Sequence, residues 1–405
     1  MLVKKEFISV GRPSFLRHTN ALTILKLLRE AGSCSRADLV RASGLSAPTV
    51  TNIVSDLEAA DLIKPLGEGE SSGGRPPDMI SFNAARGCLL AVDIKADHLS
   101  FLLTDLRGNQ LDTLKFPLKG ESTTPDSICE LIRAQAAILF KRNRSSRRQL
   151  LALIVGVPAI TDVGKGIVVS ISPFEGWRAV PLRTMLKAIF RCLVVIENDT
   201  NLAALGERYR GAAQAEETFI LINIGANVSA GIVLGGKVHH GAQWSAGEIA
   251  YMRLPGVSRK FPSLYEFGEL ETLLTSAALI KEWKTIETRS ETGRKLRGPQ
   301  AEVSDVLNLA QQGNAQAKQM VMRRAILVSD ILVNLSLILN PGLILLGGEV
   351  GSHPCLLSLV SKELERCEFA VTRIASAGLE QAAAVLWGAI AIALEEIPYV
   401  LLPSP

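Results

Sequence analysis

The sequence lacks the features that mark secreted, metal-clustered or membrane-spanning proteins. Its six cysteines include no CxxC or other short pair, which argues against a disulfide framework and a clustered-cysteine zinc site. The first residues are charged and no apolar run follows them, so we expect no signal peptide. The most apolar stretch, 325–348, is interrupted by polar residues and a proline. We expect a helix, a turn and a strand there, and a cytoplasmic protein with reduced thiols and no membrane contact.

A strong net charge is also missing, since the 405 residues carry a formal net charge of only +4. The charge is unevenly spread: residues 1–50 hold eight Lys and Arg against three Asp and Glu, and residues 51–82 hold two against six. A DNA-binding surface is therefore expected in the first fifty residues. The alternative is an ordinary solvated surface.

The first sixty residues have a pattern typical of a helix-turn-helix. An amphipathic helix is expected over 17–31. Ser35 then precedes a short helix over 36–43, and after a glycine turn Ser46 precedes a third helix, with Pro48 tolerated in its first turn. Two short helices around a glycine turn predict a DNA-binding helix-turn-helix, with a small protein-interaction module as the alternative.

The third helix has the polar outer face that reading DNA requires. Small side chains let the backbone approach the major groove, and Thr49, Thr51 and Asn52 can donate or accept hydrogen bonds there. Arg17 and Arg36 are placed to meet phosphates. The DNA contacts predicted for this region are Arg17, Ser35, Arg36, Ser46, Pro48, Thr49, Thr51 and Asn52.

Two short strands, 62–66 and 79–82, are expected on either side of a flexible glycine-rich segment. This arrangement is typical of the wing of a winged helix. Arg75, which lies between glycine and proline, is expected to reach the minor groove. The alternative is a plain linker tip with a solvated Arg75.

The rest of the chain contains a duplicated unit. Residues 88–110 and 218–240 both read as an apolar strand, a tight turn and a second apolar strand, with Asp93 aligned to Asn223. The repeat predicts two related lobes that each open with a β-hairpin. Helices alternate with strands after each hairpin, so we expect an α/β body that closes over ligands in a cleft between its lobes.

Short motifs in a fixed order support this division; they are Arg36–Leu39, Gly44–Ser46, Thr49–Val50, Gly74–Pro76, Gly156–Pro158, Gly176–Trp177, Val180–Leu182, Glu197–Asn201, Gly241, Ala246–Glu248, Asn340–Pro341, Leu346–Gly348 and Gly388–Ala389. Together they resemble the regulator branch of the ROK family, whose name joins repressors, unassigned reading frames and sugar kinases. The resemblance covers nearly the whole chain. It implies an α/β protein in which a winged helix-turn-helix precedes a two-lobed hexokinase/actin-like (ribonuclease H-like) body. The domains expected are 1–82 for the winged helix-turn-helix, 83–200 for the first lobe with a C-terminal helix over 385–398, and 201–384 for the second lobe.

The resemblance implies two phosphate-binding hairpins, and both are altered here. Family kinases carry Asp-x-Gly-Gly-Thr in the first, where glycine backbone and threonine hydroxyl groups donate to phosphate. Here Asp93 is followed by Ile-Lys-Ala-Asp, which leaves Lys95 as a partial substitute for the lost donors and puts the Asp97 carboxylate beside the phosphates. The second hairpin reads Gly-Ala-Asn over 225–227 in place of Gly-Thr-Gly. We therefore expect no kinase activity, no catalytic residue and no cofactor.

The resemblance also implies a sugar site. Asn198 and Asp199 match the family's sugar-contacting Asn and catalytic-base Asp, and Glu248 and Glu271 match two sugar-binding glutamates. Without usable ATP, Asp199 can still accept a hydrogen bond from the sugar hydroxyl that it would deprotonate in a kinase. Several acceptors suit a polyol, and such a site rejects analogues that leave them unpaired. The alternative is that these acids are ordinary surface or capping residues.

The zinc site of the family is altered as well. Tyr251 stands at the position of its histidine ligand, and residues 261–269 contain no cysteine. Because zinc needs about four N or S ligands, we expect no metal. The Tyr251 hydroxyl is expected to take over the sugar contact of the histidine.

These expectations combine into a sugar-responsive DNA-binding transcriptional regulator, which the resemblance makes a repressor of carbohydrate-metabolism genes. Its expected partners are a double-stranded DNA operator and a sugar or sugar-phosphate effector. A homodimer or homotetramer is expected, since two-fold symmetry would match a palindromic operator. Two alternatives are an active ATP-dependent sugar kinase with a DNA-binding appendage, and a ligand-blind regulator controlled by a protein partner.

Overall fold

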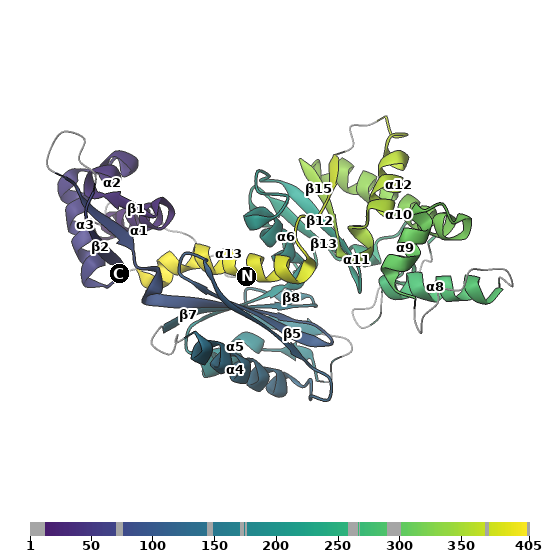
Figure 1. Cartoon of the computed structure of the whole chain (residues 1–405), viewed down its shortest axis with the longest axis horizontal. Helices are drawn as coiled ribbons and strands as arrows, with labels where there is room; N and C mark the ends of the chain where they lie inside the picture. Colours follow the sequence, from purple (N-terminus) through teal and green to yellow (C-terminus); the bar gives the residue numbers. More distant parts are fainter. Residues whose placement is uncertain are drawn as a thin grey trace.

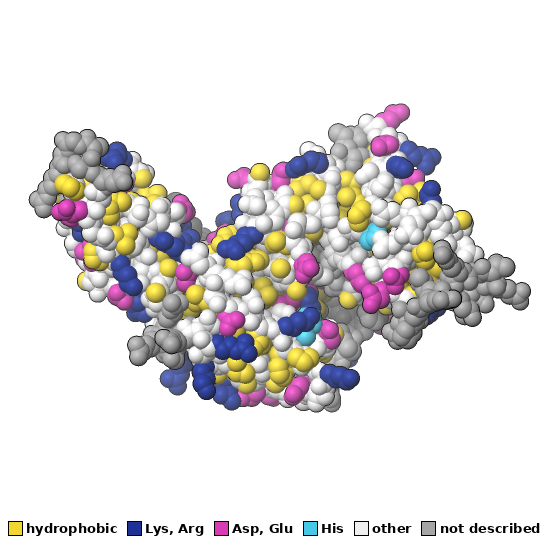
Figure 2. Space-filling model, viewed as in Figure 1, with side chains coloured by type: hydrophobic (Ala, Val, Ile, Leu, Met, Phe, Trp, Pro, Cys, Tyr) yellow, Lys and Arg dark blue, Asp and Glu magenta, His cyan; other side chains and the backbone are white. Residues whose placement is uncertain are grey.

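A computed structural model of the chain describes residues 13–69, 76–143, 149–170, 174, 176–257, 266, 268–289, 301–368 and 372–402. It has three parts: a small N-terminal domain and two α/β lobes, with a long C-terminal helix running between the N-terminal domain and the lobes (Figure 1). The N-terminal domain projects from the body, so that the surface is notched between it and the second lobe (Figure 2).

The N-terminal domain is a winged helix-turn-helix, as predicted. Its elements are α1 (Pro13–Ala31), β1 (Ser33–Ser35), α2 (Arg36–Ser43), α3 (Ala47–Ala59), β2 (Ile63–Glu68) and β3 (Asp78–Phe82). The three strands form an antiparallel sheet in the order β1-β3-β2. The predicted strands agree with β2 and β3 to within two residues, whereas β1 was not predicted.

Local capping explains where the two short helices of this domain begin and end. The Ser35 side chain accepts a hydrogen bond from the Asp38 backbone, and the Asp38 carboxylate accepts one from the Ser35 backbone, which forms a capping box. Gly44 ends α2 in the left-handed region at φ 68°, where glycine is favoured. Ser46 caps α3 by accepting from the Thr49 backbone. The apolar side of α3 is buried against α1.

The first lobe is built on a five-stranded sheet in the order β11-β7-β4-β5-β6. Its strands are β4 (Gly87–Ile94), β5 (His98–Asp105), β6 (Gln110–Pro117), β7 (Gln149–Val157) and β11 (Leu193–Asn198). Helices α4 (Pro125–Arg142) and α5 (Leu182–Phe190) cover one face of this sheet (Figure 1). A 3-10 turn, η1 (Ala84–Arg86), precedes β4, and a small sheet is formed by β8 (Thr161–Asp162), β9 (Ile167–Ser170) and β10 (Arg178–Val180).

The second lobe has a sheet of the same design in the order β14-β13-β12-β15-β16. Its strands are β12 (Phe219–Ile224), β13 (Val228–Leu234), β14 (Lys237–Val238), β15 (Leu343–Gly347) and β16 (Arg373–Ser376). Its helical elements are η3 (Ile249–Tyr251), α7 (Glu271–Leu274), α8 (Ser276–Arg289), α9 (Val303–Gln311), α10 (Ala315–Leu339), α11 (Gly348–Gly351) and α12 (Pro354–Leu364). Each sheet contains an antiparallel hairpin, β4–β5 in the first lobe and β12–β13 in the second. The first strand of each hairpin pairs with a parallel strand, β7 or β15, which in turn pairs with a second parallel strand, β11 or β16. The duplication predicted from the sequence is confirmed.

Two helices link the lobes and the N-terminal domain. Helix α6 (Asp199–Arg210) follows β11 directly, and α13 (Gln381–Leu401) packs against α6, β4 and β7. The backbones of α6 and α13 touch, because an added Cβ at Gly388 would lie 1.8 Å from the Leu202 carbonyl oxygen. Helix α13 is long and apolar enough to cross a membrane, but 56% of its most apolar stretch is buried in the protein, as in a core helix. The sequence predicted a C-terminal helix over 385–398, and α13 extends beyond this range at both ends.

One continuous apolar core includes buried residues of α1, β4, α6 and α13. The N-terminal domain is also joined to the body by polar contacts. The Arg29 guanidinium donates to the Leu394 carbonyl in α13, and Arg107 donates to the Gly32 carbonyl at 2.5 Å. The winged domain is thus packed directly on α13.

Candidate functional site

The outer surface of α3 presents the polar side chains that the sequence predicted for DNA contact. Thr51, Asn52, Ser46 and Pro48 are exposed, and the hydroxyls of Ser46 and Thr49 lie 2.8 Å apart. These groups start at the N-terminus of α3, where the helix dipole favours a phosphate. The surface therefore offers both hydrogen-bonding groups and a positive helix end to DNA.

The other residues predicted to contact DNA differ in their exposure. Arg17 is exposed on α1, but Arg36 forms an ion pair of 3.0 Å with Glu58 of α3, so part of its charge is neutralised within the domain. Ser35 is buried in its capping box and is only 5% exposed, so its side chain is held inside the domain. Arg75 lies outside the described residues. Lys64, exposed on β2 and not predicted, is a further basic residue of the wing.

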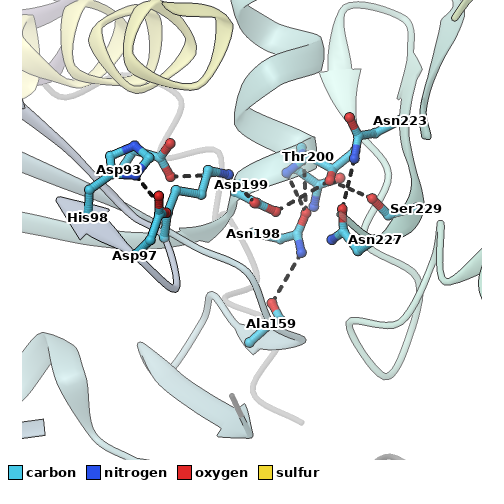
Figure 3. A network of polar contacts seen from close by, with 12 residues as sticks. Asp93, Asp97, His98, Ala159, Asn198, Asp199, Thr200, Asn223, Asn227 and Ser229 are labelled. Carbon is cyan, nitrogen blue, oxygen red and sulfur yellow. Dashed lines mark hydrogen bonds and ion pairs between the residues drawn. The ribbon is translucent and has the colours of Figure 1, made fainter. Parts of the chain in front are cut away.

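A second candidate site lies in the α/β body, where Lys95 contacts two aspartates, Asp93 and Asp199, both of which are labelled in Figure 3. Lys95 lies in the turn between β4 and β5, and its Nζ is 2.6 Å from Asp199 Oδ2 and 3.5 Å from Asp93 Oδ1. The exposed fractions of the side chains are 19% for Lys95, 0% for Asp93 and 2% for Asp199. The sequence left Lys95 as a partial substitute for the lost phosphate donors; in the structure its ammonium group contacts the sugar-site aspartate.

The protonation of this group follows from its burial and its charges. Burial raises the pKa of Asp93 to about 7, although the Lys95 ammonium acts in the opposite direction. Burial alone would lower the pKa of Lys95, but the carboxylates of Asp199 and Asp93 overcome that effect and raise it above its ordinary value. Lys95 is therefore a permanent cation that is held between two carboxyl groups.

Asn198 and Asp199 stand where β11 ends and α6 begins. The Asn198 amide oxygen caps α6 by accepting from the Thr200 and Asn201 backbones, and its Nδ2 donates to the Ala159 carbonyl at 3.2 Å. The predicted sugar-contacting amide therefore has a structural role, and one N–H of its Nδ2 remains for a ligand. Asp199 lies in the first turn of α6, where the helix dipole favours a negative charge.

The three other predicted sugar residues lie near Asp199 on the second lobe. Burial raises the pKa of Glu248 to about 7, and the nearby carboxylates of Glu271 and Asp199 add to the rise. Burial also raises the pKa of Tyr251, with Glu271 and Glu248 adding to it. These mutual effects show that the structure brings Asp199, Glu248, Tyr251 and Glu271 together across the two lobes.

Glu271, Tyr251 and Glu248 differ in how many of their hydrogen-bonding groups are already used within the protein. The Glu271 carboxylate accepts from the Gly268 backbone at 2.9 Å and the Val228 backbone at 3.3 Å, which ties it to the second hairpin. The Tyr251 hydroxyl donates to the Glu266 carbonyl at 2.9 Å, so it is left as an acceptor for a ligand. Glu248 makes no hydrogen bond or ion pair through its side chain with the described part of the chain. It is the most available acceptor of the set.

Side-chain contacts stabilise the second hairpin and join it to α6. Asn223 Nδ2 donates to Asn227 Oδ1 at 2.8 Å, and the hydroxyls of Thr200 and Ser229 lie 2.7 Å apart (Figure 3). These contacts engage Asn223 Nδ2, Asn227 Oδ1 and the Ser229 hydroxyl group.

A histidine–glutamate pair at the same site was not predicted. His240 Nε2 lies 2.7 Å from Glu197 Oε2, and the other oxygen of Glu197 accepts from Asn198 N and Asn201 Nδ2. The His240 ring meets the edge of Trp244 at a centroid distance of 5.2 Å. The sequence showed only that His239 and His240 are adjacent, and nothing local in it indicated the contact with Glu197.

Among the described residues, no group of three or more His, Cys, Asp and Glu side chains is arranged to hold a metal ion. Residues 261–265 and 267, which belong to the segment compared with the family's zinc ligands, lie outside the described part. The absence of a metal site stays a prediction for that segment.

Comparison with known proteins agrees with both parts of this architecture. Residues 89–396 match the model of the ROK family, and residues 17–64 match that of a winged helix-turn-helix DNA-binding domain. The xylose repressor of Bacillus spizizenii is 26% identical over 358 residues, which are 88% of this chain and 89% of the repressor. The glucokinase of Halalkalibacterium halodurans is 27% identical over 242 residues, which are 58% of this chain and 71% of the glucokinase. The crystal structure of a ROK family transcriptional regulator, a homologue of the Escherichia coli Mlc protein, has a TM-score of 0.78 at 23% identity and covers 96% of this chain and 98% of its own.

Proposed function

The chain belongs to the ROK family and carries a winged helix-turn-helix, and from this premise we propose that it is a sugar-responsive, DNA-binding transcriptional repressor of carbohydrate-metabolism genes. Its body would bind a sugar without phosphorylating it. The relative with a repressor's name matches a larger share of the chain than the relative with a kinase's name. This supports the regulator rather than the enzyme as the whole-chain function.

One observation carries the proposal that the body senses a sugar and does not phosphorylate it. The Lys95 ammonium lies 2.6 Å from Asp199, the residue that matches the catalytic base of the kinases. A general base must reach the proton of the attacking hydroxyl and take it. The Asp199 oxygen that contacts the Lys95 ammonium is not free to reach that proton, but the remaining lone pairs of the carboxylate still accept hydrogen bonds. The site thus keeps acceptors for a polyol while its base is occupied.

The phosphate side of the cleft supports the same proposal. Phosphoryl transfer depends on groups that position and neutralise the phosphates. At the first hairpin, Lys95 is bound to aspartates and Asp97 is exposed with its carboxylate. At the second, Asn223 and Asn227 bind each other. Neither hairpin keeps the glycine and threonine residues with which the family's kinases hold a triphosphate.

The DNA-reading surface in this proposal is the exposed face of α3. Thr51 and Asn52 would contact base edges, and the N-terminal turn with Ser46, Pro48 and Thr49 would approach phosphates. Arg17, Arg36 and the wing residue Arg75 would add phosphate or minor-groove contacts. Ser35 would act by capping α2 rather than by touching DNA, because its side chain is buried.

A continuous line of packed helices supports communication between the sugar site and the DNA reader. Asp199 opens α6, α6 packs on α13, and α13 contacts α1 of the winged domain. A sugar would favour one closure state of the lobes, and α13 would carry that change to the winged domain. Each tenfold preference for one state shifts the equilibrium by about 1.4 kcal/mol. We further propose a cytoplasmic homodimer or homotetramer, whose symmetry would match a palindromic operator.

The proposal is tested by selecting binding sites from a randomised duplex library with the full chain. We expect enrichment of a palindromic sequence, and loss of that enrichment in Asn52→Ala, because its side chain faces outward on α3. The control is Ser361→Ala, which removes a hydroxyl group from α12 in the second lobe. Absence of any sequence preference in the parent protein would refute a role as an operator-binding regulator.

The rival enzyme function needs its own assay. An active sugar kinase would consume ATP in the presence of a hexose, and Asp199→Asn would abolish that consumption. We expect no sugar-dependent ATP turnover from the parent protein. Turnover at a rate typical of enzymes, about 1–1000 per second, would contradict the assignment as a non-enzymatic sensor.

A further inference from the structure

The charges around the sugar site are strongly unbalanced. Five carboxyl groups gather where the lobes meet, and they are Asp93, Glu197, Asp199, Glu248 and Glu271. Within the described part of the chain, the cationic or potentially cationic side chains that pair with them are Lys95 and His240. Among the described residues, the site therefore has an excess of negative charge.

Lys95 is the only permanent cation among these pairs, and both of its partners are aspartates of the site. Lys95 contacts Asp199 at 2.6 Å and Asp93 at 3.5 Å, and less than a fifth of its side chain is exposed. An anionic ligand could use Lys95 only by taking it from Asp199, which would leave two buried carboxyl groups without a counter-charge. Breaking a buried ion pair in this way is strongly unfavourable.

His240, the other side chain that can carry a positive charge, is also paired with a carboxyl group. His240 lies 2.7 Å from Glu197, whose side chain is almost fully buried and also supports Asn198 and Asn201. If His240 is protonated, its charge is balanced by Glu197. Neither Lys95 nor His240 therefore provides a free positive charge for a ligand.

The acceptors that remain open carry negative charge. Glu248 makes no side-chain hydrogen bond or ion pair with the described residues, and its neighbours Glu271 and Asp199 are also acids. Neutral hydroxyl groups can donate to these oxygens. A phosphate or carboxylate group offers few donors and brings its own negative charge close to them.

We infer that the cleft takes an uncharged, unphosphorylated sugar and rejects sugar phosphates and sugar acids. This inference rests on the proposed function, since it names the chemical class of the effector of the same site. It narrows the sequence-based expectation, which allowed a sugar or a sugar phosphate. Hydroxyl groups donate to Glu248, Glu271 and Asp199, while the contact with Lys95 holds the Asp199 side chain in place.

The test compares uncharged sugars with charged derivatives of the same ring. D-glucose, D-xylose, D-mannose and N-acetyl-D-glucosamine are titrated into the full chain at pH 8, alongside the 6-phosphates of the three hexoses and D-glucuronate. Binding is followed by calorimetry and by tryptophan fluorescence, because Trp244 lies beside His240 at the site. We expect at least one uncharged sugar to bind about thirtyfold or more tightly than its charged derivative, a size typical of one uncompensated charge pair in a partly buried site.

A variant tests whether the carboxylates cause the discrimination. Glu248→Gln keeps the size of the side chain and removes its charge, so the ratio between the uncharged sugar and its phosphate should fall about tenfold. Glu365→Gln, an exposed acid at the end of α12, is the matched control and should leave the ratio unchanged.

The outcomes separate this inference from the proposed function. A sugar phosphate or sugar acid that binds more tightly than its uncharged parent, and changes DNA binding, would overturn the inference and leave the regulator function standing. An unchanged ratio in Glu248→Gln would overturn the charge argument. No binding of any sugar in the panel would contradict both the inference and the sugar-sensing part of the proposed function.

Discussion

Replacing Lys95 with methionine tests the structural role of the lysine between the lobes. Methionine fills a similar volume but leaves Asp93 and Asp199, both almost fully buried, without their cation. Removing one partner from a buried pair typically costs about 3–5 kcal/mol. Because Lys95 is 19% exposed, we expect a loss near the lower end, about 3 kcal/mol at pH 8.

The loss should depend on pH with a defined sign. Burial already raises the pKa of Asp93 to about 7 in the presence of Lys95, and removal of the cation would raise it further. A raised pKa contributes stability that is complete below the ordinary pKa near 4 and is lost as the pH rises through the folded-state value. The variant should therefore come closer to the parent protein at pH 5.5, where Asp93 holds a proton, and fall away from it at pH 8.

The assay is thermal unfolding of the full chain at both pH values, followed by calorimetry. Lys237→Met is the matched control, because Lys237 is exposed on β14 and forms none of the ion pairs described for the chain. A loss of about 3 kcal/mol should lower the melting temperature by several degrees, and adding Asp199→Asn to Lys95→Met should recover part of it. A Lys95→Met variant as stable as the control at pH 8, or a gap that does not change with pH, would refute the reasoning.

Three further predictions follow from the same structure. Gly388→Ala should lower the melting temperature by the equivalent of about 1–3 kcal/mol or more, because its Cβ would lie 1.8 Å from the Leu202 carbonyl oxygen and force α6 and α13 apart; an unchanged melting temperature would contradict this packing. Asn52→Ala should weaken operator binding by about 1–3 kcal/mol in a mobility-shift titration and relax the base preference at one position of each half-site; an equal loss on all sequences would point to a phosphate contact instead. Glu248→Gln should remove a pH-dependent contribution to stability, since the raised pKa of about 7 stabilises the parent protein below pH 4.5 and ceases to do so as the pH passes 7; parallel stability–pH curves for variant and parent would oppose this.

Local signals in the sequence were sufficient to place the DNA-binding domain. Ser35 and Ser46 stand before the two short helices, and serine caps depend on residues only three positions away. The bounds of α2 are those predicted. The strand β1 was missed because three residues give no alternation to detect, and they become a strand only by pairing with β3.

The duplicated hairpins were also predictable, because the same apolar pattern appears twice and each strand pairs with its sequence neighbour. The contacts within the cleft were not. Lys95 and Asp199 are separated by 104 residues, and Glu197 and His240 by 43. Their directions depend on how the lobes pack, and the sequence shows only which residues are available. That is why the sequence indicated neither the contact of Lys95 with Asp199 nor that of His240 with Glu197.

In the proposed function, sugar binding in the cleft changes DNA binding by the winged domain without phosphorylation of the sugar. The most direct measurement is fluorescence anisotropy of the selected operator duplex bound to the full chain, titrated with uncharged sugars in the absence of ATP and magnesium. The account predicts that at least one uncharged sugar shifts operator affinity by tenfold or more, which corresponds to about 1.4 kcal/mol. Operator affinity that no sugar changes, or that a sugar changes only when ATP is added, would contradict it.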